Sequence, residues 1–432
     1  MLELTRKFEG LFMEDLAALN IVPANEYPRA TDHINEMVDL IKDLERNGLA
    51  YQSDEGSWYF NVGKKEGYGK QLVNLDVKKM MVGASGDAGS RRGEDADEYD
   101  ADKVGVRDFA LWKAYKPNFD REDAVWDVSI GKGRPGWHLE CSAMARKYLG
   151  DTIDIHCGGI DLKFPHHENE IAQSEGATLK KYVNYWVHNG FVNIGEEKMS
   201  KSKGNFLTLR TACPKDDDVR AYRYLVVSSQ YRNPLTFTQK TLDASKSALK
   251  RIDKVKLQLS VILGETEATT SDTLTDDDSE SSQKSDITKQ VQKHLNNYNL
   301  ALLDDLSMPR AAASLFAIVK LAEMHFKEIN KDDSLSYDMD GLHSVQHALI
   351  QMDKVFGIFY TVPNLNHDED DNDDDSLEGI VPEDVMELVT QRIEAKKEKE
   401  WELADNLRNQ VIELGFSIKD VKEGVPLVTR LD

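Results

Sequence analysis

Apolar residues recur at helical spacing through much of the second half of the chain. Between positions 296 and 326 they fall three or four residues apart, at Leu300, Leu303, Leu306, Ala311, Leu315, Ile318 and Leu321. This period predicts helices, and Pro309 interrupts it because proline removes a helical hydrogen bond. The pattern therefore predicts a pair of bundle helices broken at Pro309. A further helical stretch is predicted over 384–414, followed by short strands as far as Leu431.

The segment 123–206 has a different pattern, in which short apolar runs punctuated by Gly and Pro alternate with longer helical stretches. Residues 185–194 read Tyr-Trp-Val-His-Asn-Gly-Phe-Val-Asn-Ile and predict a strand. Pro165 occupies a first-turn position of a predicted helix, where its missing N–H costs nothing. Strands that alternate with helices indicate an α/β fold. The reactive polar residues of the chain gather in this same segment.

Three acidic segments interrupt these patterns. The formal net charge is −23, of which residues 94–102 carry −6, residues 265–286 carry −7 and residues 368–378 carry −8. These segments bury too little apolar area to offset the cost of ordering, so we expect an acidic surface loop over 82–103 and solvated linkers over 265–286 and 366–380. The alternative is that they are interaction tails. Because the rest of the chain is nearly neutral, the acidic total does not exclude an RNA partner.

Composition narrows the class of protein. A chain of 432 residues with 40% hydrophobic and 30% charged residues fits a soluble protein of two to four domains. No apolar run approaches the ~18 residues of a membrane helix, and the first residues lack the layout of a secretory signal. Three cysteines cannot form a disulfide framework, which indicates a reducing, cytoplasmic location and leaves a thiol available for a metal. Nothing in the pattern specifies an oligomeric state.

A metal site is suggested by the run Pro165-His-His-Glu-Asn-Glu170. His166 and Glu170 are four residues apart, so their side chains fall on one face of the predicted helix and can reach one metal ion. This spacing alone is weak, because most such pairs are surface neighbours. The preceding run Gly136-Trp-His-Leu-Glu-Cys141 adds a thiolate candidate, and His156-Cys-Gly-Gly-Ile-Asp161 adds small residues that allow close backbone approach.

These runs closely resemble the zinc-binding region of cysteinyl-tRNA synthetases. The resemblance implies that zinc is held by two cysteines, a histidine and a glutamate, that the substrate thiolate binds the metal directly, and that three ligands are Cys141, His166 and Glu170. It further implies that the side-chain pocket is walled by Trp137 and lined by His156, and that Asp161 accepts the substrate ammonium. Packing discriminates cysteine from serine by only ~1–3 kcal/mol, whereas zinc binds thiolate much better than an alcohol.

The string Lys198-Met-Ser-Lys-Ser202 resembles the KMSKS loop of class I aminoacyl-tRNA synthetases. Adenylate formation expels pyrophosphate, so negative charge builds on the leaving phosphates, and the ammonium groups of Lys198 and Lys201 would stabilise it. By this resemblance Met199, Ser200 and Ser202 complete the ATP-binding loop, with Mg²⁺ accompanying ATP. A basic and polar string can also be a plain solvated loop, but its place after the metal cluster favours the functional interpretation.

The resemblance implies a fold and a function for nearly the whole chain. We expect a class I Rossmann-like catalytic domain with a connective insertion over 1–240, a connecting helix over 241–264, an all-α helical bundle (DALR-like) domain over 287–365 and a small anticodon-recognition module over 381–432. The implied activity is that of a cysteine–tRNA ligase, which activates L-cysteine with ATP to the adenylate and transfers it to tRNA(Cys). Zn²⁺ is the expected cofactor.

The chain departs from the family pattern at its start. The family has a His-x-Gly-His-like signature, preceded by a cysteine that gives a fourth zinc ligand, but here no H-x-G-H occurs and the first cysteine is Cys141. We therefore expect an N-terminally truncated catalytic domain, from an incomplete gene model or a shortened isoform. An organellar location stays open, because a transit peptide would precede Met1.

Other functions are compatible with parts of this pattern. The main alternative to the ligase is a catalytically inactive, tRNA-binding form of the same scaffold. A ligase that joins cysteine to an amino sugar is disfavoured by the module over 381–432, which such enzymes lack. A zinc hydrolase is disfavoured because no H-E-x-x-H general base is present.

Overall fold

The structure is a computed structural model. It describes residues 2–74, 108–195, 197–198, 207–264, 285–332 and 334–362, and within the C-terminal part residues 385, 388–389, 391–392, 395–396, 401–419 and 427–430. The expected acidic loop 82–103, the linker 366–380 and nearly all of the linker 265–286 lie outside these residues. The chain forms two compact units. Unit 1 comprises residues 1–11, 23–191 and 232–234, and unit 2 comprises the remainder.

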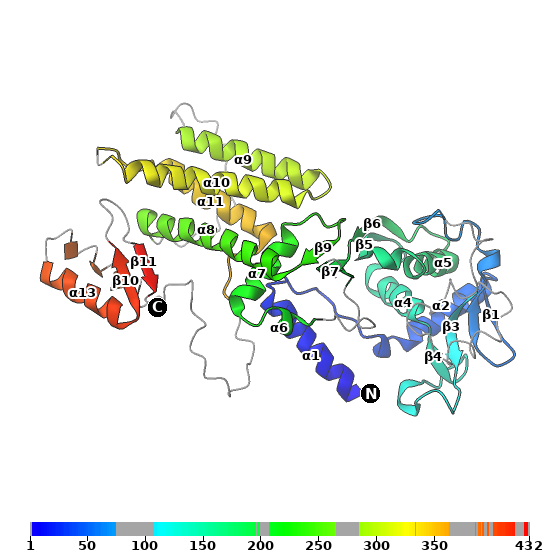
Figure 1. Cartoon of the computed structure of the whole chain (residues 1–432). Helices are drawn as coiled ribbons and strands as arrows, with labels where there is room; N and C mark the ends of the chain where they lie inside the picture. Colours follow the sequence, from blue (N-terminus) through cyan, green and yellow to red (C-terminus); the bar gives the residue numbers. More distant parts are fainter. Residues whose placement is uncertain are drawn as a thin grey trace. The chain divides into compact units, whose positions relative to one another are not determined.

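A four-stranded antiparallel sheet forms one part of unit 1 (Figure 1). Its strands lie in the order β1 (Ala50–Gln52), β2 (Trp58–Phe60), β3 (Phe109–Ala114) and β4 (Gly133–Pro135). Helix α2 (Ile34–Arg46) buries apolar residues three and four apart, including Met37, Ile41 and Leu44, against this sheet. The shared core therefore joins the sheet to the helices that carry the polar residues of interest.

A parallel βαβ element forms the other part of unit 1. Strand β5 (Ile153–Gly159) pairs in parallel with β6 (Val183–Asn189), with His156 opposite Trp186. The connection runs through the short 3-10 helix Ile160–Lys163 and helix α5 (His166–Thr178), as parallel pairing requires a crossover. Helix α4 (Trp137–Leu149) follows β4 directly. The α/β fold is thus confirmed. The predicted helix is present but begins at His166, so Pro165 precedes it rather than lying in its first turn.

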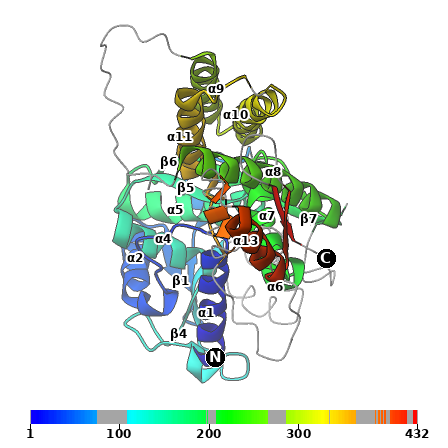
Figure 2. The same ribbon diagram turned by 90° about the vertical axis from the view of Figure 1, so that its left-hand side faces the viewer.

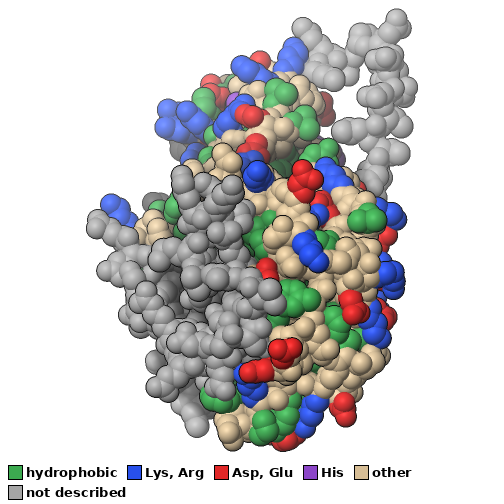
Figure 3. Space-filling view, turned by 90° about the vertical axis from the view of Figure 1, so that its right-hand side faces the viewer, with side chains coloured by type: hydrophobic (Ala, Val, Ile, Leu, Met, Phe, Trp, Pro, Cys, Tyr) green, Lys and Arg blue, Asp and Glu red, His purple; other side chains and the backbone are tan. Residues whose placement is uncertain are grey.

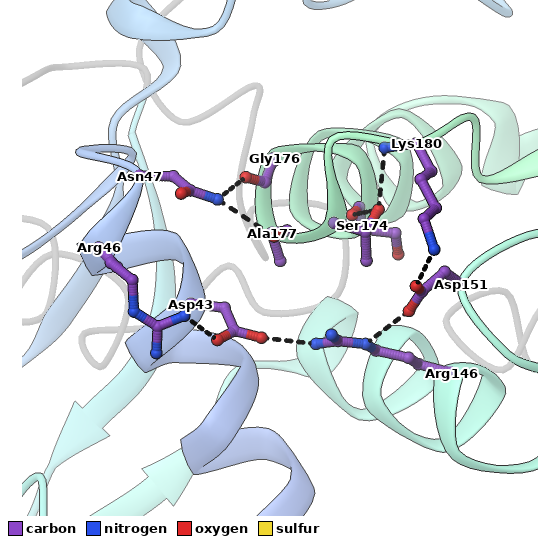
Figure 4. Close-up of polar contacts among 10 residues, drawn as sticks. Asp43, Arg46, Asn47, Arg146, Asp151, Ser174, Gly176, Ala177 and Lys180 are labelled. Atoms are coloured by element: carbon purple, nitrogen blue, oxygen red, sulfur yellow. Dashed lines mark hydrogen bonds and ion pairs between the residues drawn. The ribbon is translucent and has the colours of Figure 1, made fainter.

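An ion-pair chain ties α2 to α4 and to the end of α5 (Figure 4). Asp43 accepts from Arg46 at 2.9 Å and from Arg146 at 2.7 Å, and Asp151 accepts from Arg146 at 3.0 Å and from Lys180 at 2.8 Å. The Asn47 side chain donates to the carbonyls of Gly176 and Ala177 at 2.8 and 3.1 Å. Figure 1 and Figure 2 both show α2, α4 and α5 gathered together. These contacts fix the two helices that carry the metal-ligand candidates.

Unit 2 is mainly helical. It contains α6 (Leu209–Ala212), α7 (Asp216–Val227), α8 (Gln239–Leu263), α9 (Asp286–Leu303), α10 (Met308–Ile329) and α11 (Met339–Phe356). The last five contribute buried residues to one apolar core, and Ala212 of α6 packs against it. A small sheet orders β8 (Glu197–Lys198), β7 (Val192–Ile194) and β9 (Leu235–Phe237). The strand predicted over 185–194 is therefore divided into β6 and β7. Helix α1 (Leu2–Ala18) begins in unit 1 and ends in unit 2.

The predicted helix pair is present, but its break and its buried face differ from the prediction. The turn between α9 and α10 spans residues 304–307, and Pro309 lies in the first turn of α10, where its missing N–H leaves no helical hydrogen bond unmade. Leu300 and Leu303 are exposed because α9 turns Val291, Tyr298 and Ala301 into the core instead. Leu306 is exposed in the turn after α9. In α10, by contrast, Ala311, Leu315 and Ile318 are buried as expected.

The C-terminal part contains helix α13 (Trp401–Glu413) and an antiparallel pair, β10 (Phe416–Lys419) and β11 (Leu427–Arg430). Every described residue between 385 and 396 is helical as well, in agreement with the predicted pattern. Among the described residues, no helix combines the length and the apolar character needed to cross a membrane. Lys, Arg, Asp and Glu side chains are interspersed on the face shown in Figure 3, so no single sign of charge dominates its described surface.

Candidate metal centre

Helix α5 is unusual because a run of polar residues on it is buried. All residues from 166 to 174 are buried, although only Ile171 and Ala172 among them are aliphatic. Charged residues are almost never fully buried unless they are paired, so each polar side chain calls for a partner. Glu168 accepts backbone hydrogen bonds from Leu72 at 2.7 Å and Val73 at 3.1 Å, and Asn169 accepts one from the Tyr68 hydroxyl at 2.5 Å.

Glu170 differs from its neighbours on the helix. Its carboxylate is 1% exposed, and its oxygens lie 2.6 Å from His166 Nε2 and 2.8 Å from His156 Nε2. These approaches are close, yet within the described part of the chain neither oxygen has a partner in hydrogen-bond geometry. Burial acts to raise the pKa of Glu170, but the adjacent imidazoles of His156 and His166 outweigh it and lower the pKa to about 2. Glu170 is therefore an anionic ligand candidate.

Cys141 completes a possible metal set with these residues. It lies one turn into α4, and ligand atoms of Cys141, His166 and Glu170 all lie within 4.8 Å of one another. Burial, together with the Glu170 charge, raises the pKa of the Cys141 thiol to about 12. A divalent cation reverses that preference, because the thiolate is the form that ligates metal. One sulfur, one imidazole and one carboxylate are donors that zinc accepts, so these residues fit a zinc ion.

A second set of possible ligands shares Glu170. Ligand atoms of His156, His167 and Glu170 also lie within 4.8 Å of one another. His167 Nδ1 lies 2.8 Å from His188 Nε2, and burial lowers the pKa of His167 to about 4, so the ring is neutral at pH 7. In the sequence, His167 is only a neighbour of the ligand candidate His166, and no motif singles out His188. A histidine within a β-strand pattern gives no signal of its own.

Of the predicted substrate-binding residues, Trp137 and His156 lie beside the metal-ligand candidates His166 and Glu170. The Trp137 ring lies 4.4 Å from the His166 ring and is half exposed. His156, on β5, packs edge-on to Trp186 with ring centroids 4.6 Å apart. Asp161 follows β5, and a Cβ added to Gly159 would lie 2.6 Å from Asp161 Oδ1. A side chain at 159 would therefore displace the Asp161 carboxylate from its present position.

His166, the first ligand candidate on α5, also has a partner that the sequence did not reveal. His138, on α4 beside Trp137, lies with Nδ1 2.8 Å from His166 Nδ1. Both rings are buried, each about 4% exposed.

Of the predicted ATP-binding residues, the structure describes only the backbone of Lys198. The backbone of Lys198 belongs to β8, where it pairs with Asn193 of β7. Met199, Ser200, Lys201 and Ser202 lie outside the described residues.

The sequence is similar to a known family over residues 1–247 and to known proteins over nearly its whole length. Residues 1–247 match the family model described as tRNA synthetases class I (C) catalytic domain. The chain is 38% identical over 424 residues to the cysteine–tRNA ligase of Brachyspira hyodysenteriae, covering 98% of this chain and 80% of that protein. It is also 38% identical over 428 residues to the cysteine–tRNA ligase of Chlamydia pneumoniae, covering 98% and 79% respectively.

Among solved structures, the chain resembles methionyl-tRNA synthetase of Mycobacterium tuberculosis in complex with methionyl-adenylate. The TM-score is 0.50 at 14% identity, over 82% of this chain and 76% of that one. A likeness at this identity supports the fold alone. With the family match and the long alignments to curated relatives, it confirms the class I α/β fold: this chain belongs to the cysteine–tRNA ligase family of class I tRNA synthetases.

Proposed function

We propose that the protein activates L-cysteine with ATP and transfers it to tRNA(Cys). The relatives that it matches over nearly its whole length are named cysteine–tRNA ligases. The observation that carries the proposal is the buried Glu170 carboxylate, whose oxygens lack hydrogen-bond partners among the described residues and face His156 and His166. Together with Cys141, this carboxylate supports a metal-based recognition of a thiol substrate.

Cys141, His166 and Glu170 would hold a zinc ion. Bound zinc supplies a Lewis-acidic position that prefers a thiolate to the hydroxyl of serine. Trp137 would wall the pocket beside His166, and His156 would line it from β5. Asp161 would accept the substrate ammonium, since a carboxylate next to the end of a parallel strand is well placed to bind a small ligand. These residues orient the amino acid rather than take part in bond making.

Lys198 and Lys201 would stabilise the charge that develops on pyrophosphate when the cysteine carboxylate attacks the α-phosphate of ATP. Met199, Ser200 and Ser202 would complete the ATP-binding loop, with Mg²⁺ bound to the nucleotide. Lys198 follows β7 through a short turn and pairs with it, which supports a loop fixed at its first residue.

Recognition of tRNA is proposed for the C-terminal half, with a helical bundle over 287–365 and an anticodon-recognition module over 381–432. One exposed face of α9 suits this partner. Lys289, Gln292, Lys293, Asn296 and Asn297, together with Thr288, line a shallow hollow without a carboxylate. Ammonium and amide groups of this kind bind RNA phosphates and ribose hydroxyls.

The decisive experiment is amino-acid-dependent ATP–pyrophosphate exchange by the 432-residue chain, followed by charging of tRNA(Cys). Exchange with cysteine and not with serine is expected. Zinc and tRNA binding without exchange would instead support a catalytically inactive, tRNA-binding form. That outcome is the rival to test because no H-x-G-H signature occurs in these 432 residues.

A further inference from the structure

The histidine pair between α4 and α5 bears on the proposed metal site. His138 Nδ1 and His166 Nδ1 are 2.8 Å apart, which is hydrogen-bond distance, and both rings are buried. Trp137 packs against both rings, with centroids 5.4 Å from His138 and 4.4 Å from His166. Phe109 meets His138 edge-on at 5.8 Å. Packing therefore restricts rotation of His138 and holds its Nδ1 toward His166.

The position of one proton decides what His166 can do. His166 faces Glu170 through Nε2, at 2.6 Å, so Nε2 is the nitrogen available to a metal ion. A ligating imidazole is neutral and offers a lone pair, so its proton must reside on the other nitrogen. That nitrogen, Nδ1, points at His138 Nδ1, which must then accept the hydrogen bond. The opposite tautomer of His166 would place a proton on Nε2 and block the metal.

We propose that His138 is a positioning residue, which accepts a hydrogen bond from His166 and so keeps the His166 Nε2 lone pair directed at the metal site. The inference rests on the proposed set of Cys141, His166 and Glu170. Ligating histidines generally donate their second N–H to an acceptor, and loss of that acceptor typically costs about 10–100-fold in metal affinity. Here a second histidine is in the place usually taken by a carboxylate or carbonyl.

The His167–His188 pair provides an internal comparison. It has the same 2.8 Å separation, but it orients the histidine of the second possible set, His156, His167 and Glu170. If the metal ion occupies the set Cys141, His166 and Glu170, substitution of His138 should weaken metal binding and substitution of His188 should not. If the metal ion occupies the second set, substitution of His188 should weaken metal binding and substitution of His138 should not.

The test uses the full chain and five variants, the fifth being His188→Asn for the comparison above. His138→Asn keeps an acceptor near the Nδ1 position, His138→Gln moves the amide away from it, and His138→Leu removes it. His33→Asn is the matched control, because His33 is 3% exposed and hydrogen-bonded to the Arg29 carbonyl and the Tyr148 hydroxyl, yet belongs to neither metal set. Zinc affinity is measured by competition with a chromophoric chelator. The Tm of each variant in chelator shows whether that variant is folded without metal.

We expect His138→Leu and His138→Gln to bind zinc about 10–100-fold more weakly. The zinc affinity of His138→Asn and His33→Asn should stay close to that of the unsubstituted chain. The Co²⁺ absorption spectrum of the Gln variant should show a changed ligand field while keeping the thiolate charge-transfer band of Cys141. Equal zinc affinity in the Gln and Asn variants would overturn the inference, whether or not the Leu variant folds. If a His188→Asn variant alone loses zinc, the metal occupies the second set. If the unsubstituted chain binds no zinc, the proposed metal set itself fails.

Discussion

Two glutamates of α5, Glu168 and Glu170, are equally buried at 1% exposure but have different surroundings. Glu168 accepts two backbone hydrogen bonds from residues 72 and 73, whereas Glu170 faces histidines and has no hydrogen-bond partner within the described residues. We therefore predict that only one of the two substitutions weakens zinc binding. Glu168→Ala should destabilise unit 1 and leave the zinc affinity of the folded protein unchanged. Glu170→Gln should weaken zinc binding by the folded protein.

The size of each effect follows from these contacts. A hydrogen bond to a charged group contributes about 1.5–3 kcal/mol, and Glu168→Ala removes two of them. Leu72 and Val73 are only half-buried, so water can replace part of this loss, and we expect a net destabilisation of about 3 kcal/mol. For a unit of this size that lowers Tm by about 6–12 °C. Glu168→Gln keeps an acceptor oxygen and should lose less than half as much.

Glu170→Gln removes the buried anion that His156 and His166 stabilise, so it should also lower the free energy of unfolding in chelator. Its zinc affinity should fall by at least about 100-fold, the upper end of what loss of an outer partner costs, because a ligand itself is altered. Urea unfolding followed by tryptophan fluorescence reports mainly unit 1, which contains five of the six tryptophans. If Glu168→Ala weakens zinc as strongly as Glu170→Gln does, the division of roles is wrong.

Three further outcomes are expected. Cys157 is exposed, whereas Cys213 is buried and burial raises the pKa of its thiol to about 12. A thiol reagent at pH 7 should therefore label Cys157 in the native chain and Cys213 only after unfolding, as measured by mass spectrometry of peptides. Charge reversal of Lys289 and Lys293 on α9 should weaken tRNA binding. It should also reduce the slope of log affinity against log salt concentration by about one for each phosphate that the helix no longer neutralises. Unchanged binding would show that α9 does not contact the tRNA. In chelator, unfolding free energy should fall between pH 6.5 and pH 4, because burial lowers the pKa of His167 to about 4 and the unfolded chain therefore takes up a proton that the folded chain does not. The slope should approach ~1.4 kcal/mol per pH unit for that proton and flatten in His167→Gln.

The metal-ligand candidates could be named from sequence because they are local or rest on a family resemblance. His166 and Glu170 are four apart on a helix whose start Pro165 marks, and the structure places both beside Cys141. The whole ATP-binding string stays a prediction, since only the backbone of Lys198 is described and the residues after it lie outside the described ranges. The domain boundaries stay predictions too.

The contacts of His138 and His188 could not be predicted in this way. His138 meets His166 only because α4 and α5 pack together, and His188 meets His167 only because the parallel register of β5 and β6 carries it there. Neither register nor helix packing is encoded by spacing along one segment. The exposed leucines of α9 have a related cause. Helical period identifies a helix, but which stripe is buried depends on neighbours, and there Tyr298 and Ala301 face the core.

The polar character of α5 explains why the metal site and the surrounding fold depend on each other. A helix whose residues 166–174 are all buried, with few apolar side chains, cannot be stabilised by an apolar face alone. Each face of α5 has its own partner. Glu168 accepts from the backbone of Leu72, Asn47 donates to the last turn of the helix, and His166 contacts His138 of α4. Because these partners come from three separate elements, α5 is ordered only when all of them are in place. The Glu170 carboxylate, the one anionic group there left without a hydrogen bond among the described residues, is then held in position before any metal ion arrives.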